Sequence, residues 1–93
     1  LEEIFKDLIH ISKYQILIDF KKFIRLNLEV KIKVINKSIK TLRKNYYDPR
    51  SKKVKFLIRS IEKQSFKKAT LGGCLFYKKK ENLCLMAEKG VKN

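Results

Sequence analysis

The stretch from Asp48 to Glu62, DPRSKKVKFLIRSIE, decides how this chain is divided into elements. It contains Pro49, the one proline of the sequence. Because proline fixes its own φ and disfavours helical backbone at the preceding residue, a helix that arrives from the N-terminal side should end here. A basic run and then an apolar segment follow the proline. The stretch therefore predicts a boundary and, after it, a new element of mixed character.

Apolar residues alternate with lysine in the new element. Val54 and Phe56 fall on one side of an extended chain and Lys53 and Lys55 on the other, which is the pattern of a half-buried strand. The sequence thus predicts a strand with lysines on its solvent face. Those lysines either bind a partner or only protect an edge strand against aggregation. Ser60 is expected to cap a short helix after the strand.

Charge is the strongest compositional feature of the chain. Its 93 residues include 24 Lys plus Arg against 9 Asp plus Glu, a formal net charge of +15, and 44% of them are hydrophobic. A chain of this length forms one domain with a modest core, which leaves little room for a deep active site. Such a positive charge repels itself in a compact fold, so the expected partner is a polyanion, nucleic acid before anionic membrane. An enzyme is not expected.

The choice of residue types offers a second explanation for part of the lysine excess. Lysine outnumbers arginine by twenty to four, Ile, Asn, Phe and Tyr are common, and Trp is absent. A- and T-rich codons specify this set, so the composition is typical of a biased genome such as an organellar one. No apolar run reaches the roughly eighteen residues of a membrane span, and no membrane partner is expected.

The cysteines and the histidine do not indicate a metal site. Cys74 and Cys84 are ten residues apart, without a CxxC pair, and far from His10, the one histidine. Zinc sites and disulfide frameworks need closer or more numerous ligands, so no metal and no cofactor are expected. Apolar neighbours predict that both cysteines are buried reduced thiols. His10 lies off the apolar side of its segment and is expected to face solvent.

The first half of the chain predicts three elements. Leu1 to Lys13 repeats apolar residues at helical spacing and has acidic residues in its first turn, which predicts an amphipathic helix. Tyr14 to Phe20 alternates apolar and polar residues and predicts a strand. Leu26 to Tyr46 begins with alternation but continues with apolar spacings of three and four. This longer pattern favours a helix, with a strand as the alternative.

The remaining elements complete an α+β prediction. Ile61 to Thr70 predicts a short helix that Gly72-Gly73 would end, since glycine often follows a helix C-terminus. CLFY and LCLMA, on either side of Lys78 to Asn82, predict a hairpin or else one terminal strand preceded by a basic loop. The expected fold is an open β-sheet with two helices packed on one face. Residues 1–13 would be an N-terminal helical extension of a single domain at residues 14–93.

Motifs of common catalytic sites do not occur in the chain. It has no GxGxxG, P-loop, GxSxG or HExxH pattern, so no small-molecule substrate is expected. Several aromatic residues lie in basic surroundings, where a ring can stack on an unpaired base, although packing in the core is the commoner role. These residues are Tyr14, Tyr46, Tyr47, Phe66 and Tyr77.

The expected order of strand, long helix, strand, short helix and strand resembles the small-subunit ribosomal proteins of the universal S-ten family. That family has a segment of the form LPxxxxxxxVLRSPH. Here Pro49 lies ten residues before Arg59, and LIRS at residues 57–60 is similar to the VLRS part. YQILIDF resembles the opening strand of the family, and LCLMA its terminal strand. The family's Pro-His pair is replaced by Ile61-Glu62.

The resemblance implies a structural constituent of the small ribosomal subunit, located in the ribosome of a mitochondrion or another organelle. Its partners would be ribosomal RNA and neighbouring subunit proteins, and its lysines would neutralise RNA phosphates. A basic ribosomal protein similar to the S-eight family, or a free RNA- or DNA-binding regulatory module, are the alternatives. The residues expected to bind RNA, on the central strand, the following helix and the basic loop, are Arg50, Lys52, Lys53, Lys55, Arg59, Lys63, Lys67, Lys68, Lys78, Lys79 and Lys80.

Overall fold

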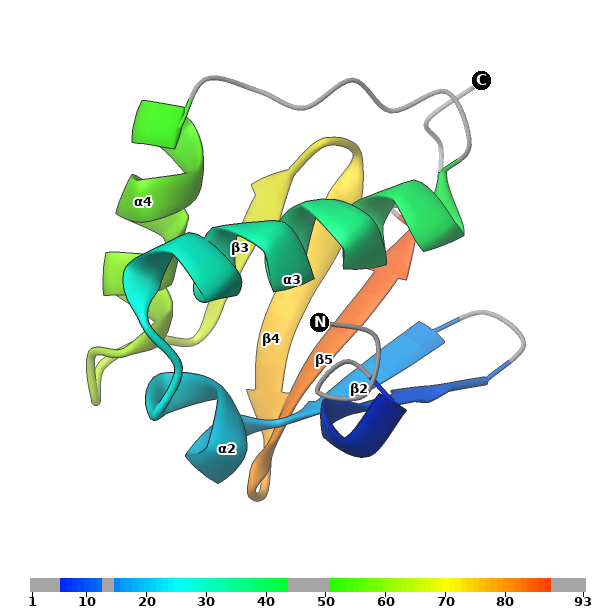
Figure 1. Ribbon diagram of the computed structural model, residues 1–93, viewed down its shortest axis with the longest axis horizontal. Helices are drawn as coiled ribbons and strands as arrows, with labels where there is room; N and C mark the ends of the chain where they lie inside the picture. Colours follow the sequence, from blue (N-terminus) through cyan, green and yellow to red (C-terminus); the bar gives the residue numbers. More distant parts are fainter. Residues whose placement is uncertain (1–5, 13–14, 44–50, 88–93) are drawn as a thin grey trace.

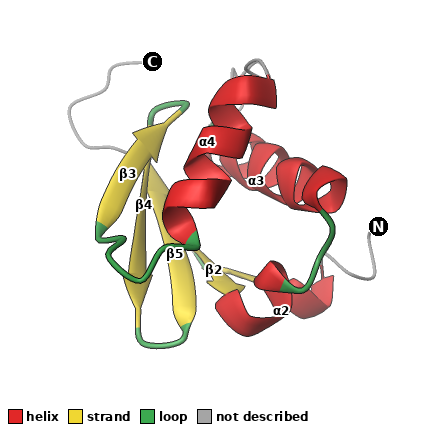
Figure 2. Ribbon diagram, turned by 90° about the vertical axis from the view of Figure 1, so that its left-hand side faces the viewer, coloured by secondary structure: helices red, strands yellow, loops and turns green. Residues whose placement is uncertain are grey.

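A computed structural model of the chain describes residues 6–12, 15–43 and 51–87. In these residues the strands form one antiparallel sheet in the order β1-β2-β5-β4-β3, and helices α3 and α4 lie over the same face of it (Figure 1, Figure 2). The expected α+β fold is therefore confirmed. The strands are β1 (Ile9–Ile11), β2 (Gln15–Asp19), β3 (Lys68–Leu71), β4 (Cys74–Lys79) and β5 (Asn82–Ala87), and the helices are α2 (Phe20–Ile24), α3 (Leu28–Leu42) and α4 (Ser51–Ile61).

The core lies between the sheet and its covering helices. On β2, Ile16 and Ile18 are completely buried. Phe76 of β4 and two leucines of β5, Leu83 and Leu85, are buried with them in one cluster. Because side chains alternate along a strand, these residues share the helix-covered face of the sheet. The strand predicted at residues 14–20 is confirmed over Gln15–Asp19, and the C-terminal apolar runs form a hairpin, one of the two alternatives.

Helix α3 confirms the favoured prediction for its segment. Asn27 caps it, because its side-chain oxygen accepts a hydrogen bond of 2.9 Å from the backbone N–H of Val30. Its buried apolar residues, Val34, Ile35 and Ile39, recur at spacings of one and four and pack on the sheet. The helix ends at Leu42, and the last residues of the predicted span lie outside the described ones.

The strand predicted after Pro49 is wrong, because residues 51–61 form helix α4. Its apolar residues Val54, Leu57, Ile58 and Ile61 follow the spacing i, i+3, i+4, i+7, and all four are buried. Phe56 falls off this stripe and is 73% exposed, so the expectation that it packs inward is also wrong. The alternation covers only four residues, 53–56, whereas the helical periodicity of the buried residues covers eight, 54–61.

The helix predicted at residues 61–70 is wrong as well. Ser60 lies in the last turn of α4 and does not cap a new helix, because its hydroxyl donates a hydrogen bond of 3.0 Å to the carbonyl of Phe56. Strand β3 follows after a short loop. Gly72 and Gly73 have positive φ angles of 62° and 77° and form the two-residue turn of the β3–β4 hairpin. Glycine accepts such angles without strain, which suits it to this turn.

Near the N-terminus, Ile9–Ile11 forms edge strand β1, which pairs antiparallel with β2. The helix predicted as far as Lys13 is therefore wrong over these residues, and helical backbone is described only just before them. Leu8 is buried in the core cluster, and His10 is exposed, as expected. Leu1, Ile4 and Phe5, which contributed to the helical prediction, lie outside the described residues.

Candidate nucleic-acid interface

The outward side of α4 carries the densest group of predicted site residues. We call Lys52, Lys53, Lys55 and Arg59, with Phe56 among them, the α4 basic face. All five side chains are exposed, because the opposite side of the helix is buried against the sheet and α3. The lysines are predicted on a strand, but in the helix Lys52, Lys55 and Arg59 lie three or four residues apart and so share one side of it. The sequence therefore identified exposed cations correctly and assigned them to the wrong element.

Three further predicted residues follow α4 along the chain, and the pairing of Lys68 with Tyr77 places the Lys68 side chain on the sheet face away from the helices. Lys63 follows the helix, Lys67 precedes β3, and Lys68 is the first residue of β3. All three are exposed. They were expected on a second helix, which the structure replaces with a short loop and an edge strand. Arg50, the remaining residue predicted in this region, lies outside the described residues.

Glu62 is the one carboxylate in the sequence between residues 49 and 80, and Lys31 neutralises it. The Lys31 ammonium donates to Glu62 Oε2 and so connects α3 to the C-terminal end of α4. The Lys31 side chain is only 12% exposed, and its ammonium also lies 6.0 Å from the centroid of the Phe23 ring. Because Lys31 already pairs with Glu62, this carboxylate offsets little of the positive charge of the α4 basic face.

The cations of the β4–β5 turn have different surroundings. Lys78 and Lys79 end β4, and Lys80 lies in the turn with a φ of 56°. The Lys78 ammonium lies 3.9 Å from the centroid of the Phe20 ring, so a cation–π contact holds it. The backbone N–H of Phe20 donates to the carbonyl of Glu81, 3.1 Å away, which places this turn against α2.

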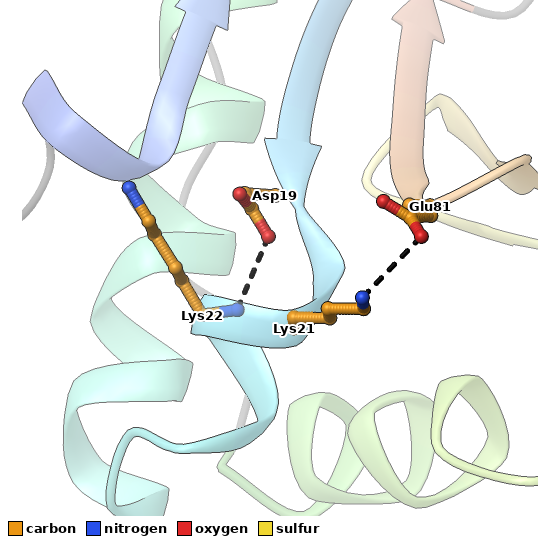
Figure 3. A network of polar contacts seen from close by, with 4 residues as sticks. All are labelled: Asp19, Lys21, Lys22 and Glu81. Carbon is orange, nitrogen blue, oxygen red and sulfur yellow. Dashed lines mark hydrogen bonds and ion pairs between the residues drawn. The ribbon is translucent and has the colours of Figure 1, made fainter.

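Carboxylates accompany the cations at this end of the sheet, as Figure 3 shows. Lys21 Nζ lies 3.3 Å from Glu81 Oε1, and Asp19 accepts a hydrogen bond of 3.2 Å from the backbone N–H of Lys22. The ten predicted residues that the structure describes thus divide into a group on α4 and in the segment that follows it, and a group at a turn of mixed charge. Of the two, only the first combines many cations with almost no opposing charge.

A groove runs between α4 and edge strand β3. It has a volume of about 630 Å³ and lies directly beside the α4 basic face. The sequence prediction missed it, although a phenylalanine off the apolar stripe of an amphipathic helix could have indicated an exposed ring. Its lining residues are Lys52, Lys53, Phe56, Leu57, Ser60, Ala69, Thr70 and Leu71.

The face of the sheet opposite the helices holds Tyr77 and Cys84, which pair across β4 and β5. Burial, together with the neighbouring Cys84, raises the pKa of Tyr77 above its ordinary value of 10.0. Burial likewise raises the pKa of Cys84 above its ordinary value of 9.0, although a hydrogen bond to Tyr77 acts in the opposite direction. Both groups therefore stay neutral at neutral pH. Cys74 and Cys84 are buried thiols, as predicted.

The other aromatic residues of the prediction add little to the interface. Phe66 is half-buried and packs against the core, the commoner of the two expected roles. Tyr14, Tyr46 and Tyr47 lie outside the described residues. In the part of the chain that the structure describes, no cluster of three His, Cys, Asp or Glu side chains could hold a metal ion. The helices described there are also too short or too polar to span a bilayer.

Comparisons with protein-family models, with curated proteins and with solved structures found no match to this chain.

Proposed function

We propose that this chain is an RNA-binding domain that contacts phosphate groups through the α4 basic face and through Lys63 and Lys67, which follow it in the sequence. Lysine and arginine on an exposed surface displace the counterions condensed on a polyanion, and this release drives binding without regard to base sequence. The net charge of +15 on a folded chain supports such a partner.

The observation that carries the proposal is that the residues of α4 that stabilise the fold and its charged residues lie on different sides of the helix. Its buried stripe packs the helix against the core, whereas its four exposed cations form no ion pair within the described residues. Surface charges of this kind contribute little to stability. A run of uncompensated cations on a well-packed helix is therefore better explained by an anionic partner than by the needs of the fold.

Membership of a small ribosomal subunit is the more specific form of the proposal. Its sequence basis was an order of elements with a strand after Pro49, and that segment is helix α4. The RNA-binding proposal does not depend on this order, since it rests on exposure and charge. Co-sedimentation of the native protein with small ribosomal subunits, retained after a moderate salt wash, is the expected result for a ribosomal constituent. Recovery only in the ribosome-free fraction would contradict it.

RNA binding itself is tested by salt titration. The affinity of the chain for a short single-stranded RNA should fall steeply between roughly 50 and 200 mM salt. If the four cations of α4 each neutralise one phosphate, the slope of log affinity against log salt should be about −3 from these residues alone. Binding that is undetectable at low salt, or that does not depend on salt, would contradict the proposal.

A further inference from the structure

The groove between α4 and β3 contains an exposed aromatic ring that the fold does not require. Phe56 is 73% exposed, although burying a phenylalanine side chain stabilises a protein by roughly 1.5 to 3 kcal/mol. Single exposed apolar residues are ordinary on protein surfaces. Phe56, however, lines a groove together with Leu57 and Leu71, and it is flanked by cations. These features together suit a ligand that is flat and apolar on one part and anionic on another.

We propose that this groove receives one unpaired nucleotide of a bound RNA, with its base against the Phe56 ring and its adjoining phosphates on Lys52 and Lys53. This inference rests on the proposed RNA-binding function and specifies the form of RNA that the site selects. Bases of a duplex are stacked inside it, so only an unpaired base can lie against an exposed ring.

The spacing along α4 supports this arrangement. Lys52 and Lys53 precede Phe56 by four and three residues, so all three lie on neighbouring parts of one helix surface. Ser60 follows Phe56 by four residues and also lines the groove. Its hydroxyl proton is used in the bond to the Phe56 carbonyl, and its oxygen lone pairs can still accept a hydrogen bond. An amino group on the edge of a base is a suitable donor for that position.

The opposite wall of the groove is the edge of the sheet, which raises the possibility of a peptide as occupant. Within the described residues β3 pairs only with β4, and an exposed edge can accept an additional strand. Lys68 on β3 is of the kind that blunts such pairing. Between residues 49 and 80 the sequence has one carboxylate, Glu62, which Lys31 already neutralises. The charge of the rim therefore favours a phosphate-bearing ligand.

The direct test uses a tryptophan in place of the ring. The chain has no tryptophan, so Phe56→Trp introduces a single tryptophan, at the groove, whose emission can be followed separately from that of the tyrosines. The probes are a short single-stranded RNA and a duplex of the same sequence. Quenching by the single strand, with much less quenching by the duplex at equal occupancy, is the expected result. Equal quenching by both, or none by either, would overturn the inference.

Removing the ring gives an independent measurement. Phe56→Ala should weaken binding of the single strand by about 5- to 150-fold, the effect of losing one stacked base, and should leave duplex binding unchanged. The slope of log affinity against log salt should not change, since no cation is removed. Leu28→Ala, which removes another exposed apolar side chain, is the control and should have no effect. Thermal unfolding of each variant verifies that it is folded.

The outcomes separate this inference from the proposed function. If the wild-type chain binds RNA with a steep salt dependence but Phe56→Ala binds the single strand as tightly as wild type, this inference fails and the proposed function stands. If the wild-type chain binds no RNA, both fail. If Phe56→Trp responds to an acidic extended peptide and not to single-stranded RNA, the groove is a peptide site and the inference is overturned.

Discussion

Helices α3 and α4 pack on the same face of the sheet, yet their outward sides differ. Both bury an apolar stripe and expose cations, namely Lys33, Lys37 and Lys40 on α3 and the cations of the basic face on α4. Helix α3 has Glu29 in its first turn. Helix α4 has no acidic residue, exposes an aromatic ring, and borders a groove.

The difference indicates which exposed lysines have a function beyond solubility. Helix α3 has exposed lysines, one carboxylate in its first turn and an N-cap at Asn27. These are the ordinary features of a solvated amphipathic helix. The exposed ring, the groove and the lack of opposing charge on α4 are not needed for stability. We therefore place the proposed RNA contacts on α4, and regard α3 as the helix that serves mainly to hold the core together.

The largest expected effect is the difference in stability between substitutions on the buried side and on the exposed side of α4. Ile58→Ala should destabilise the protein by about 2 to 5 kcal/mol, because Ile58 is 1% exposed and its removal leaves a cavity. Ile35→Ala in α3 should cost a similar amount. Phe56→Ala should change the free energy of unfolding by no more than about 0.5 kcal/mol. Urea denaturation of the three variants checks this, and a loss for Phe56→Ala as large as that for Ile58→Ala would show that the ring is structural.

An intermediate effect is expected where α3 meets the β3–β4 turn. The guanidinium of Arg43, the residue after α3, lies over Gly73, where an added Cβ would be 2.8 Å from Arg43 Nη1. Gly73 also has a φ of 77°. Gly73→Ala should therefore cost about 1 to 2 kcal/mol, and Gly73→Asn less, since asparagine tolerates this backbone conformation. Denaturation midpoints test the order, and an alanine variant as stable as wild type would contradict the described turn.

A smaller effect is expected at the start of α3. Asn27→Ala removes the acceptor for the Val30 N–H and should destabilise the protein by about 1 kcal/mol. Asn27→Asp keeps an acceptor at the same place and is the matched control, expected near wild-type stability. Both variants should bind RNA as the wild type does, because α3 is not part of the proposed interface. A change of RNA affinity in the folded Asn27→Ala variant would argue against the distinction between the helices.

The same two helices explain what the sequence could and could not predict about the fold. In α3 the apolar repeat extends over several turns, so a short alternating start did not mislead the prediction. In α4 the residues Val54 and Phe56 alternate with lysine, and this local pattern was preferred to the helical spacing of Leu57, Ile58 and Ile61. Helical backbone buries all four apolar residues of the stripe on one side. This larger burial of apolar surface determines that the segment is a helix.

The prediction that Gly72-Gly73 ends a helix is wrong for a related reason. Two glycines after a supposed helix suggest a C-terminal cap, but two glycines between apolar runs are also typical of a two-residue hairpin turn. The pairing of Leu71 with Cys74 shows that the second interpretation holds. Strand formation at Ile9–Ile11 was not predictable from its own residues, because it depends on the neighbouring edge of β2.

The candidate site was predictable in its charges but not in its shape. Exposure of the lysines on α4 follows from their hydrophilicity, whichever element contains them. The groove depends on the distance between α4 and β3, which form its two walls. The order of these two elements in the sequence does not predict that distance. The contact of Lys78 with Phe20 likewise depends on α2 lying against the β4–β5 turn.

The assignment of RNA contacts to α4 is tested most directly by comparing two double variants with equal change of charge. Lys52→Gln/Lys55→Gln removes two exposed cations from α4, and Lys33→Gln/Lys40→Gln removes two from α3. Salt titrations of binding to one single-stranded RNA should show the magnitude of the log–log slope reduced by about 1.4 for the α4 variant and nearly unchanged for the α3 variant. Equal reductions in both variants, or a larger one for α3, would contradict the account.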